Sequence, residues 1–192
     1  MKILLGVTGG IAAYKSCDVI SGLRANGHEV KVIMTKNAMQ FITPLTLSTL
    51  SGHEVMSDMW QERRGIVEHI EIAKWADIVL VYPATMNIIA KFAAGLADDL
   101  LSSVYLALPR NTIKIICPAA NTEMYHNTIT KQNIQTVLNG GRVFEFGPIE
   151  GKLACGDFGM GKAAKPRDVV EYVQEKVEEM KRFYIDKIKE TL

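Results

Sequence analysis

The sequence predicts an α/β fold, with a doubly wound, mostly parallel β-sheet and helices on both of its faces. Two observations predict this fold. Short apolar runs rich in β-branched residues, which suit buried parallel strands, alternate with longer segments of helical periodicity. The connections between them are short, as expected where strands and helices alternate. The apolar fraction of 48% and the charged fraction of 22% are ordinary for a globular protein.

Each expected element follows from its own local pattern. The expected strands are the runs KILLGV (2–7), EVKVIMT (29–35), DIVLVYP (77–83) and IKIICP (113–118). The expected helices cover 11–25, 87–108, 127–138 and about 166–190. Asn26-Gly27 would close the first helix, and Asp98-Asp99 divides the second segment, because carboxylates favour a helix N-terminus.

Length and charge restrict the function. A chain of 192 residues is expected to form one domain, 1–192, and a net charge of +1 favours neither nucleic acid nor a membrane surface as a partner. The 3 cysteines are far apart, which indicates a reducing, cytoplasmic environment rather than a disulfide framework. The 4 histidines and the cysteines lack the spacing of a zinc site, so no metal is expected.

The first two expected strands end in residues that suit a phosphate. Thr8-Gly9-Gly10 turns into a helix start, where free backbone N–H groups can bind an anion. The second strand ends in Thr35-Lys36 rather than an acidic residue, which favours a mononucleotide over NAD. The Gly-Gly turn is also compatible with an ordinary strand–helix connection.

The next two strands deliver uncharged polar groups to the same edge of the sheet. Thr85 and Asn87 follow the third run, and Asn121 and Met124 follow the fourth. Such groups suit a neutral heteroaromatic ring and a carboxylate better than a metal ion. Thr85 and Asn87 could equally be helix caps.

Cys155 lies in the glycine-rich stretch GKLACGDFGMGK (151–162), where we expect it to be exposed and to have no role in core packing. Ala163 follows Lys162, so the stretch is not a P-loop, and no His-Arg-Asp precedes Asp157, so it is not a kinase motif. We expect a glycine-hinged flap, about 148–163, that closes over a substrate. His69 is as compatible with a structural role as with a catalytic one.

Four stretches together resemble the flavin-dependent cysteine decarboxylase family over residues 2–180. They are PATMNIIAKFAAGLADDLL (83–101), HIEIAKWAD (69–77), PAANTEMY (118–125) and LACGDFGMGK (153–162). The last resembles the substrate flap of the family's coenzyme A branch. Ala120, Tyr125 and Lys162 stand where the family usually has Met, Trp and Arg.

The resemblance implies a Rossmann- or flavodoxin-like flavoprotein with FMN, assembled as a homotrimer or a larger trimer-based assembly. It implies decarboxylation of 4′-phosphopantothenoylcysteine to 4′-phosphopantetheine in coenzyme A biosynthesis, in a site shared between neighbouring subunits. His69 would assist deprotonation of the substrate thiol, Asn121 would bind its carboxylate, and Cys155 would donate a proton. Met124, Ala154 and Lys162 would also bind substrate. The residues implied to hold FMN are Gly9, Gly10, Thr35, Thr85, Met86, Asn87, Ile88 and Ala119.

Several alternatives remain open at this point. A peptidyl-cysteine decarboxylase would share the asparagine motif but lack the flap. The Asn121 motif and Cys155 argue against a flavin prenyltransferase, and Cys155 would be unexplained in an electron carrier. A non-catalytic FMN-binding regulatory subunit would typically carry acidic extensions. The chain also ends where bifunctional relatives continue into a ligase.

Overall fold

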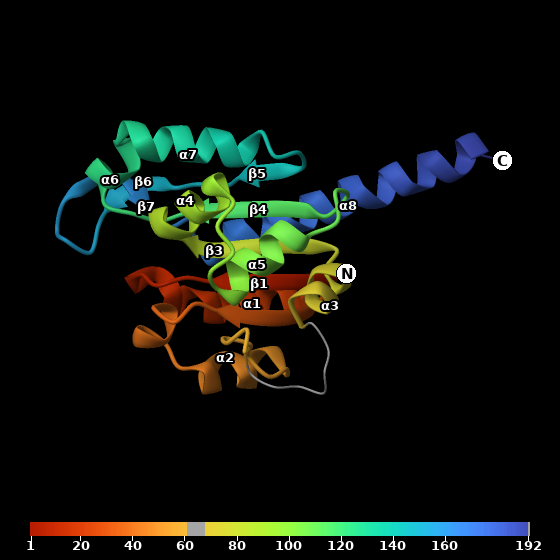
Figure 1. Ribbon diagram of the computed structural model, residues 1–192, viewed down its shortest axis with the longest axis horizontal. Coiled ribbons are helices and arrows are strands. Elements are labelled where there is room, and N and C mark those ends of the chain that lie inside the picture. Colours follow the sequence, from red (N-terminus) through yellow and green to blue (C-terminus); the bar gives the residue numbers. More distant parts are fainter. Residues whose placement is uncertain (61–67, 192) are drawn as a thin grey trace.

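The structure, a computed structural model, describes residues 1–60 and 68–191 and is built on a five-stranded parallel sheet (Figure 1). The strand order is β2-β1-β3-β4-β5, and every neighbouring pair is parallel. The strands are β1 (Lys2–Val7), β2 (Glu29–Met34), β3 (Ile78–Ala84), β4 (Ile113–Pro118) and β5 (Val143–Glu145). This is the flavodoxin-like order, in which the connection reverses direction between β1 and β3. The predicted fold class is confirmed.

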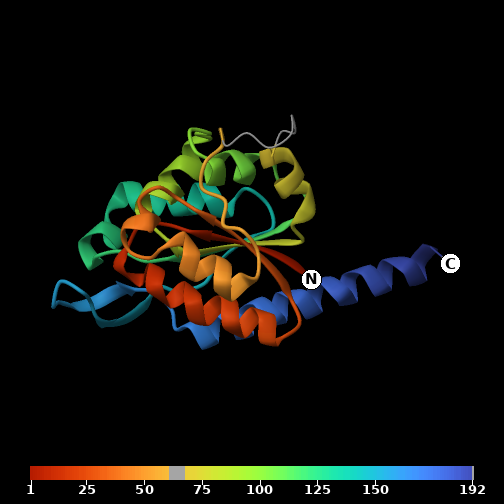
Figure 2. The ribbon, with the colours of Figure 1, turned by 90° about the horizontal axis from the view of Figure 1, so that it is seen from below.

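Helices cover both faces of the sheet (Figure 2). One face carries the 3-10 helix η1 (Ile11–Lys15), α1 (Ser16–Ala25), α2 (Pro44–Ser51) and α8 (Pro166–Thr191). The other carries α3 (Glu68–Trp75), α4 (Met86–Ala94), α5 (Leu100–Ala107) and α7 (Thr128–Leu138). The short helices η2 (Ala38–Gln40) and α6 (Thr122–His126) follow β2 and β4. Two apolar cores, one on each face, hold these layers together.

The strands are apolar because both faces of the sheet are covered. Every residue of β3 and β4 is buried, Lys114 included, and β1 is buried after Lys2. A continuous apolar run is the pattern expected of such strands. Most of the sheet is therefore apolar, and the polar residues that follow β1 and β3, such as Thr8 and Thr85, come where those strands end.

Residues 149–162 form a separate antiparallel hairpin, β6 (Ile149–Lys152) and β7 (Phe158–Lys162). It extends from the carboxyl end of the sheet, next to α6 (Figure 1). The sequence predicted a flap here but no strands, because the glycines hide the alternation typical of a hairpin. Of the helices among the described residues, none is long and apolar enough to span a membrane.

Candidate functional site

The first of two cavities at the carboxyl ends of the strands lies where β1 and β3 meet; we call it the switch-point cavity. Its volume is about 530 Å³. Every residue that the sequence analysis assigned to the cofactor lines it: Gly9, Gly10, Thr35, Thr85, Met86, Asn87, Ile88 and Ala119. Met124, which was expected to bind substrate, lies here as well. In sheets of this topology, ligands bind at this point.

Gly9 brings the loops after β1 and β2 into close contact. A Cβ atom at Gly9 would overlap Cβ of Asn37 and would lie 2.8 Å from the Asn37 carbonyl carbon. Gly10 has no such restriction, since its nearest neighbour would be the Thr85 methyl group at 3.8 Å. The turn thus requires glycine at the first position only, and it exposes backbone at the floor of the cavity.

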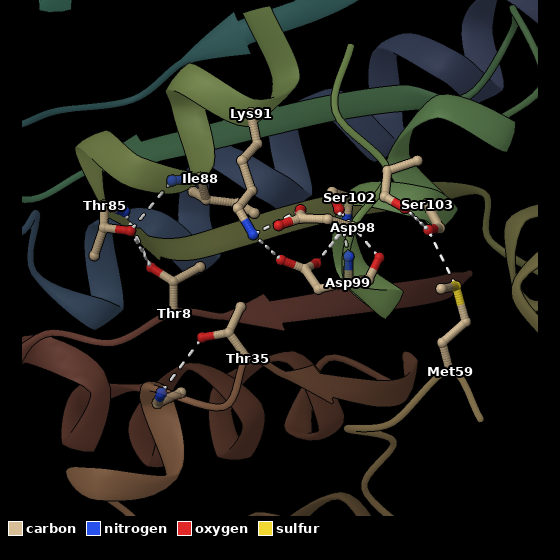
Figure 3. A network of polar contacts seen from close by, with 12 residues as sticks. Thr8, Thr35, Met59, Thr85, Ile88, Lys91, Asp98, Asp99, Ser102 and Ser103 are labelled. Atoms are coloured by element: carbon tan, nitrogen blue, oxygen red, sulfur yellow. Dashed lines mark hydrogen bonds and ion pairs between the residues drawn. The ribbon is translucent and has the colours of Figure 1, made fainter. Parts of the chain in front are cut away.

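Thr8 and Thr85 connect the ends of β1 and β3 (Figure 3). The buried Thr8 hydroxyl donates to the Pro83 carbonyl at 2.6 Å and accepts from the Thr85 backbone N–H at 3.0 Å. Thr85 is the N-cap of α4, because its hydroxyl accepts from the Ile88 N–H at 3.5 Å. The capping interpretation and the cofactor interpretation of Thr85 are therefore compatible, since a cap orients the helix start that lines the cavity.

A lysine and two aspartates close one side of the same cavity (Figure 3). Lys91 Nζ lies 2.7 Å from Asp98 Oδ1 and 2.6 Å from Asp99 Oδ2. Burial alone would lower the pKa of Lys91, but the hydrogen bonds to both carboxylates outweigh it and raise the pKa. Asp99 also caps α5 by accepting from the Ser102 N–H at 2.8 Å. This network fixes the segment between α4 and α5 against the cavity.

The second cavity, which we call the hairpin cavity, lies between η1, the β4–α6 connection and the β6–β7 hairpin, with a volume of about 380 Å³. The remaining residues predicted to bind substrate line it, together with Cys155: Asn121, Ala154, Cys155 and Lys162. Four residues line both cavities: Gly10, Thr85, Ala119 and Ala120. The two cavities therefore adjoin.

Asn121 and Cys155 meet in the hairpin cavity although 34 positions separate them in sequence. Asn121 caps α6, and its Oδ1 accepts from the Glu123 N–H at 2.9 Å. This contact orients the side chain so that the amide Nδ2 donates toward Cys155 Sγ at 3.4 Å. The Cys155 thiol in turn donates to Asp157 Oδ2 at 3.2 Å. An amide donor and a thiol proton donor thus face the same space.

Two glycines of β7 hold the hairpin against the rest of the protein. A Cβ at Gly161 would overlap the Ala120 carbonyl oxygen, and one at Gly159 would lie 2.5 Å from Thr122 Oγ1. The Ala120 N–H donates to the Gly161 carbonyl at 2.9 Å. These close contacts bring Cys155, at the turn of the hairpin, next to Asn121.

His69 lies apart from both cavities. It belongs to α3, which precedes β3, whereas the cavities lie where the strands end. Its side chain is partly exposed. Within one chain, the structure therefore does not bring His69 together with Asn121 and Cys155. Among residues 1–60 and 68–191, no group of three or more His, Cys, Asp and Glu side chains is placed to hold a metal ion.

Sequence reasoning missed one lysine in each cavity, Lys15 and Lys91, although it had assigned Lys162 to substrate binding. Lys15 lines the hairpin cavity, but in sequence it lies inside the helix expected over 11–25, where nothing marks it as a site residue. Lys91 appeared as one polar residue within an apolar helix. In sequence, the only indication of its role is that Asp98 and Asp99 follow seven and eight residues later. Their ion pairs with Lys91 form because the segment between α4 and α5 folds back onto α4.

Comparisons with known proteins identify the family to which the chain belongs. Residues 1–178 match the family described as Flavoprotein. The coenzyme A biosynthesis bifunctional protein CoaBC of Vibrio vulnificus is 44% identical over 170 residues, which cover 88% of this chain and 42% of that protein. The Escherichia coli protein of the same name is 42% identical over 88% of this chain and 41% of that protein. The chain thus spans about two fifths of the length of these curated relatives.

Solved structures resemble the chain over nearly their whole length. A mutant PPC decarboxylase complexed with pantothenoylaminoethenethiol has a TM-score of 0.82 and 30% identity, covering 92% of this chain and 98% of that one. The FMN binding protein AtHal3 has a TM-score of 0.79 and 30% identity, covering 93% and 97%. The resemblance to flavin-dependent decarboxylases is thereby confirmed, and the chain belongs to the Flavoprotein family.

Proposed function

We propose that this chain is an FMN-dependent lyase that decarboxylates 4′-phosphopantothenoylcysteine to 4′-phosphopantetheine in coenzyme A biosynthesis. The observation that carries the proposal is the contact between the Asn121 amide and the Cys155 thiol, 3.4 Å apart, beside the switch-point cavity. The similarity to coenzyme A biosynthesis proteins and to a PPC decarboxylase supports it.

The switch-point cavity fits FMN. Its floor is the Gly9-Gly10 turn, where backbone N–H groups at a helix start suit a phosphate, and Thr35 and Lys36 lie beside it. Uncharged side chains of α4, Thr85 to Ile88, form another wall, which suits a heteroaromatic ring. When bound, FMN would supply the reversible two-electron redox chemistry that makes loss of CO₂ from a cysteine possible.

Asn121 would hold the substrate carboxylate without stabilising its charge strongly. Its Oδ1 already accepts a hydrogen bond from the backbone, so only the amide N–H groups face the cavity. A neutral donor orients a carboxylate, whereas a lysine at this position would stabilise the charge that must be lost with CO₂. The capping contact thus determines which end of the amide meets the substrate.

Cys155 would donate the proton that completes the product. Its thiol lies at the exposed turn of the hairpin, within hydrogen-bond distance of Asp157. A general acid has to stand within hydrogen-bond reach of the atom that it protonates. The hairpin would therefore cover the substrate, exclude water and deliver the acid in one movement.

His69 would act in the site of a neighbouring subunit, in a homotrimer or a trimer-based assembly. This accounts for its distance from the cavities of its own chain. Large apolar side chains exposed near the carboxyl end of the sheet support an assembly: Ile11 at 59%, Phe41 at 47% and Leu45 at 75%. Mixed oligomers of His69→Asn and Cys155→Ser subunits should then recover activity that neither variant has. Recovery would be absent if both residues served the same chain.

The direct experiment supplies the purified protein with FMN and either 4′-phosphopantothenoylcysteine or a peptide that ends in cysteine. We expect release of CO₂ and formation of 4′-phosphopantetheine, measured by mass spectrometry, and much slower reaction of the peptide. Preferential reaction of the peptide would instead identify a peptidyl-cysteine decarboxylase. Failure to react with both, with FMN bound, would favour a non-catalytic flavin-binding subunit.

A further inference from the structure

The hairpin cavity has a strongly basic wall that the chemistry at Asn121 and Cys155 does not use. Lys15 enters it from the end of η1, and Lys152 and Lys162 enter it from the hairpin. Of the described residues that line this cavity, none is Asp or Glu. The other walls are largely apolar, with Ile11 and Leu153 among them. A cavity of this kind suits an uncharged chain that carries an anionic group.

Lys15 and Lys162 lack the carboxylates that usually accompany lysines in a cavity. In the described part of the chain, neither forms an ion pair, whereas Lys91 in the adjoining cavity contacts two aspartates within 2.7 Å. Both lysines are partly buried. Burial lowers the pKa of Lys15, and the positive charge of Lys162 lowers it further. Two mutually repelling cations without a counterion favour the binding of an anion between them.

The hairpin also restrains Lys162. A Cβ at the buried Gly151 would lie 3.0 Å from Lys162 Cδ and 3.4 Å from its Nζ. The side chain of Lys162 therefore runs across the backbone of the facing strand, where glycine leaves space for it. Lys152, in contrast, is exposed and has no such restraint. The side chain of Lys162 is accordingly directed along the hairpin into the cavity that it lines.

We propose that Lys15 and Lys162 form a subsite for the phosphate group of the substrate, in the same cavity as Asn121, which holds the carboxylate. This inference rests on the proposed function. A phosphate monoester carries between about −1.5 and −2 charges at pH 7 and accepts several hydrogen bonds, so two ammonium groups can neutralise it. Because a peptide that ends in cysteine has no phosphate, the pair would select the phosphorylated substrate.

Paired substrates test the subsite. Lys15→Met and Lys162→Met should each lower kcat/KM for 4′-phosphopantothenoylcysteine by about 10- to 100-fold, mainly through KM, as expected for loss of one charged hydrogen bond. The same variants should change kcat/KM for pantothenoylcysteine, which lacks the phosphate, by less than about twofold. The control is Lys165→Met, an exposed lysine outside the cavity, with no expected effect on either substrate. Equal losses with both substrates, or no loss, would overturn the proposal.

Two further measurements are needed. The first tests whether the lysines bind the phosphate of FMN instead, and the second tests the subsite even if the proposed reaction does not occur. Flavin content should be unchanged in both variants, and loss of FMN would assign the lysines to the cofactor instead. By calorimetry, the FMN-loaded wild-type protein should bind 4′-phosphopantetheine at least about tenfold more tightly than pantetheine, and both variants should lose this difference. Equal wild-type affinities would overturn the subsite even if neither substrate reacts.

Discussion

The two adjoining cavities are formed by different kinds of structural element. The switch-point cavity consists mainly of strand ends, tight turns and helix caps, fixed by contacts such as that of Thr8 with Pro83 at 2.6 Å. The hairpin cavity depends on a two-stranded segment that packs against the β4–α6 connection and the start of α6 through Gly159 and Gly161, and that carries an exposed thiol. The first suits a cofactor that stays bound, and the second suits a substrate that has to enter and leave.

The largest effect is expected for Asn121→Asp, a variant that keeps the helix cap but removes the amide that would bind the substrate carboxylate. Asn121→Asp keeps an oxygen to accept from the Glu123 N–H but replaces the amide donor by a negative charge. We expect kcat/KM to fall at least about 100-fold, because the substrate carboxylate would be repelled and would lose its donor. Flavin content and thermal stability should remain those of the wild type. Near-normal turnover of this variant would exclude Asn121 from carboxylate binding.

A smaller effect is expected in the switch-point cavity, where two adjacent glycines provide a matched pair. Gly9→Ala places a methyl group against Asn37, whereas Gly10→Ala meets only the Thr85 methyl group at 3.8 Å. Flavin affinity should fall about tenfold or more in Gly9→Ala, because the displaced loop withdraws hydrogen-bond donors from the ligand. Gly10→Ala should bind flavin within about threefold of the wild type. Titration of the apoproteins measures both, and similar affinities would contradict the structural role of Gly9.

The smallest effect concerns Asp157, which accepts from the Cys155 thiol at 3.2 Å. Asp157→Asn retains an acceptor oxygen, so kcat should fall by less than about threefold, whereas Asp157→Ala should lower it roughly tenfold by freeing the thiol. Pre-steady-state measurement of product formation would detect both changes. Equal losses in Asp157→Asn and Asp157→Ala would indicate that the negative charge, rather than orientation of the thiol, matters.

The difference between the cavities also explains how much the sequence could predict. The long strands are mainly apolar runs, and the residues that follow them and were predicted to bind the cofactor, from Gly9 to Ala119, line one cavity. The strand β5 was missed because three residues are too few for a pattern, and the hairpin because glycines replace its alternating side chains. Local sequence therefore predicted the switch-point cavity better than the hairpin cavity.

Lys15 was missed for a related reason. Whether Lys15 points into a cavity depends on the packing of a hairpin that lies more than a hundred residues away, and no local spacing encodes that contact. His69 shows the opposite case. Its assignment came from a family resemblance, and within one chain the structure leaves it outside the cavity lined by the residues with which it was expected to act.

The central claim is that the switch-point cavity binds FMN and the hairpin cavity binds and protonates the substrate. Cys155→Ser tests this claim most directly. The serine cannot serve as an equivalent acid, but the switch-point cavity is unchanged, so flavin content should equal that of the wild type. With 4′-phosphopantothenoylcysteine, this variant should release CO₂ about once per site and form no 4′-phosphopantetheine. Steady formation of 4′-phosphopantetheine at the wild-type rate would contradict the role of the hairpin cavity.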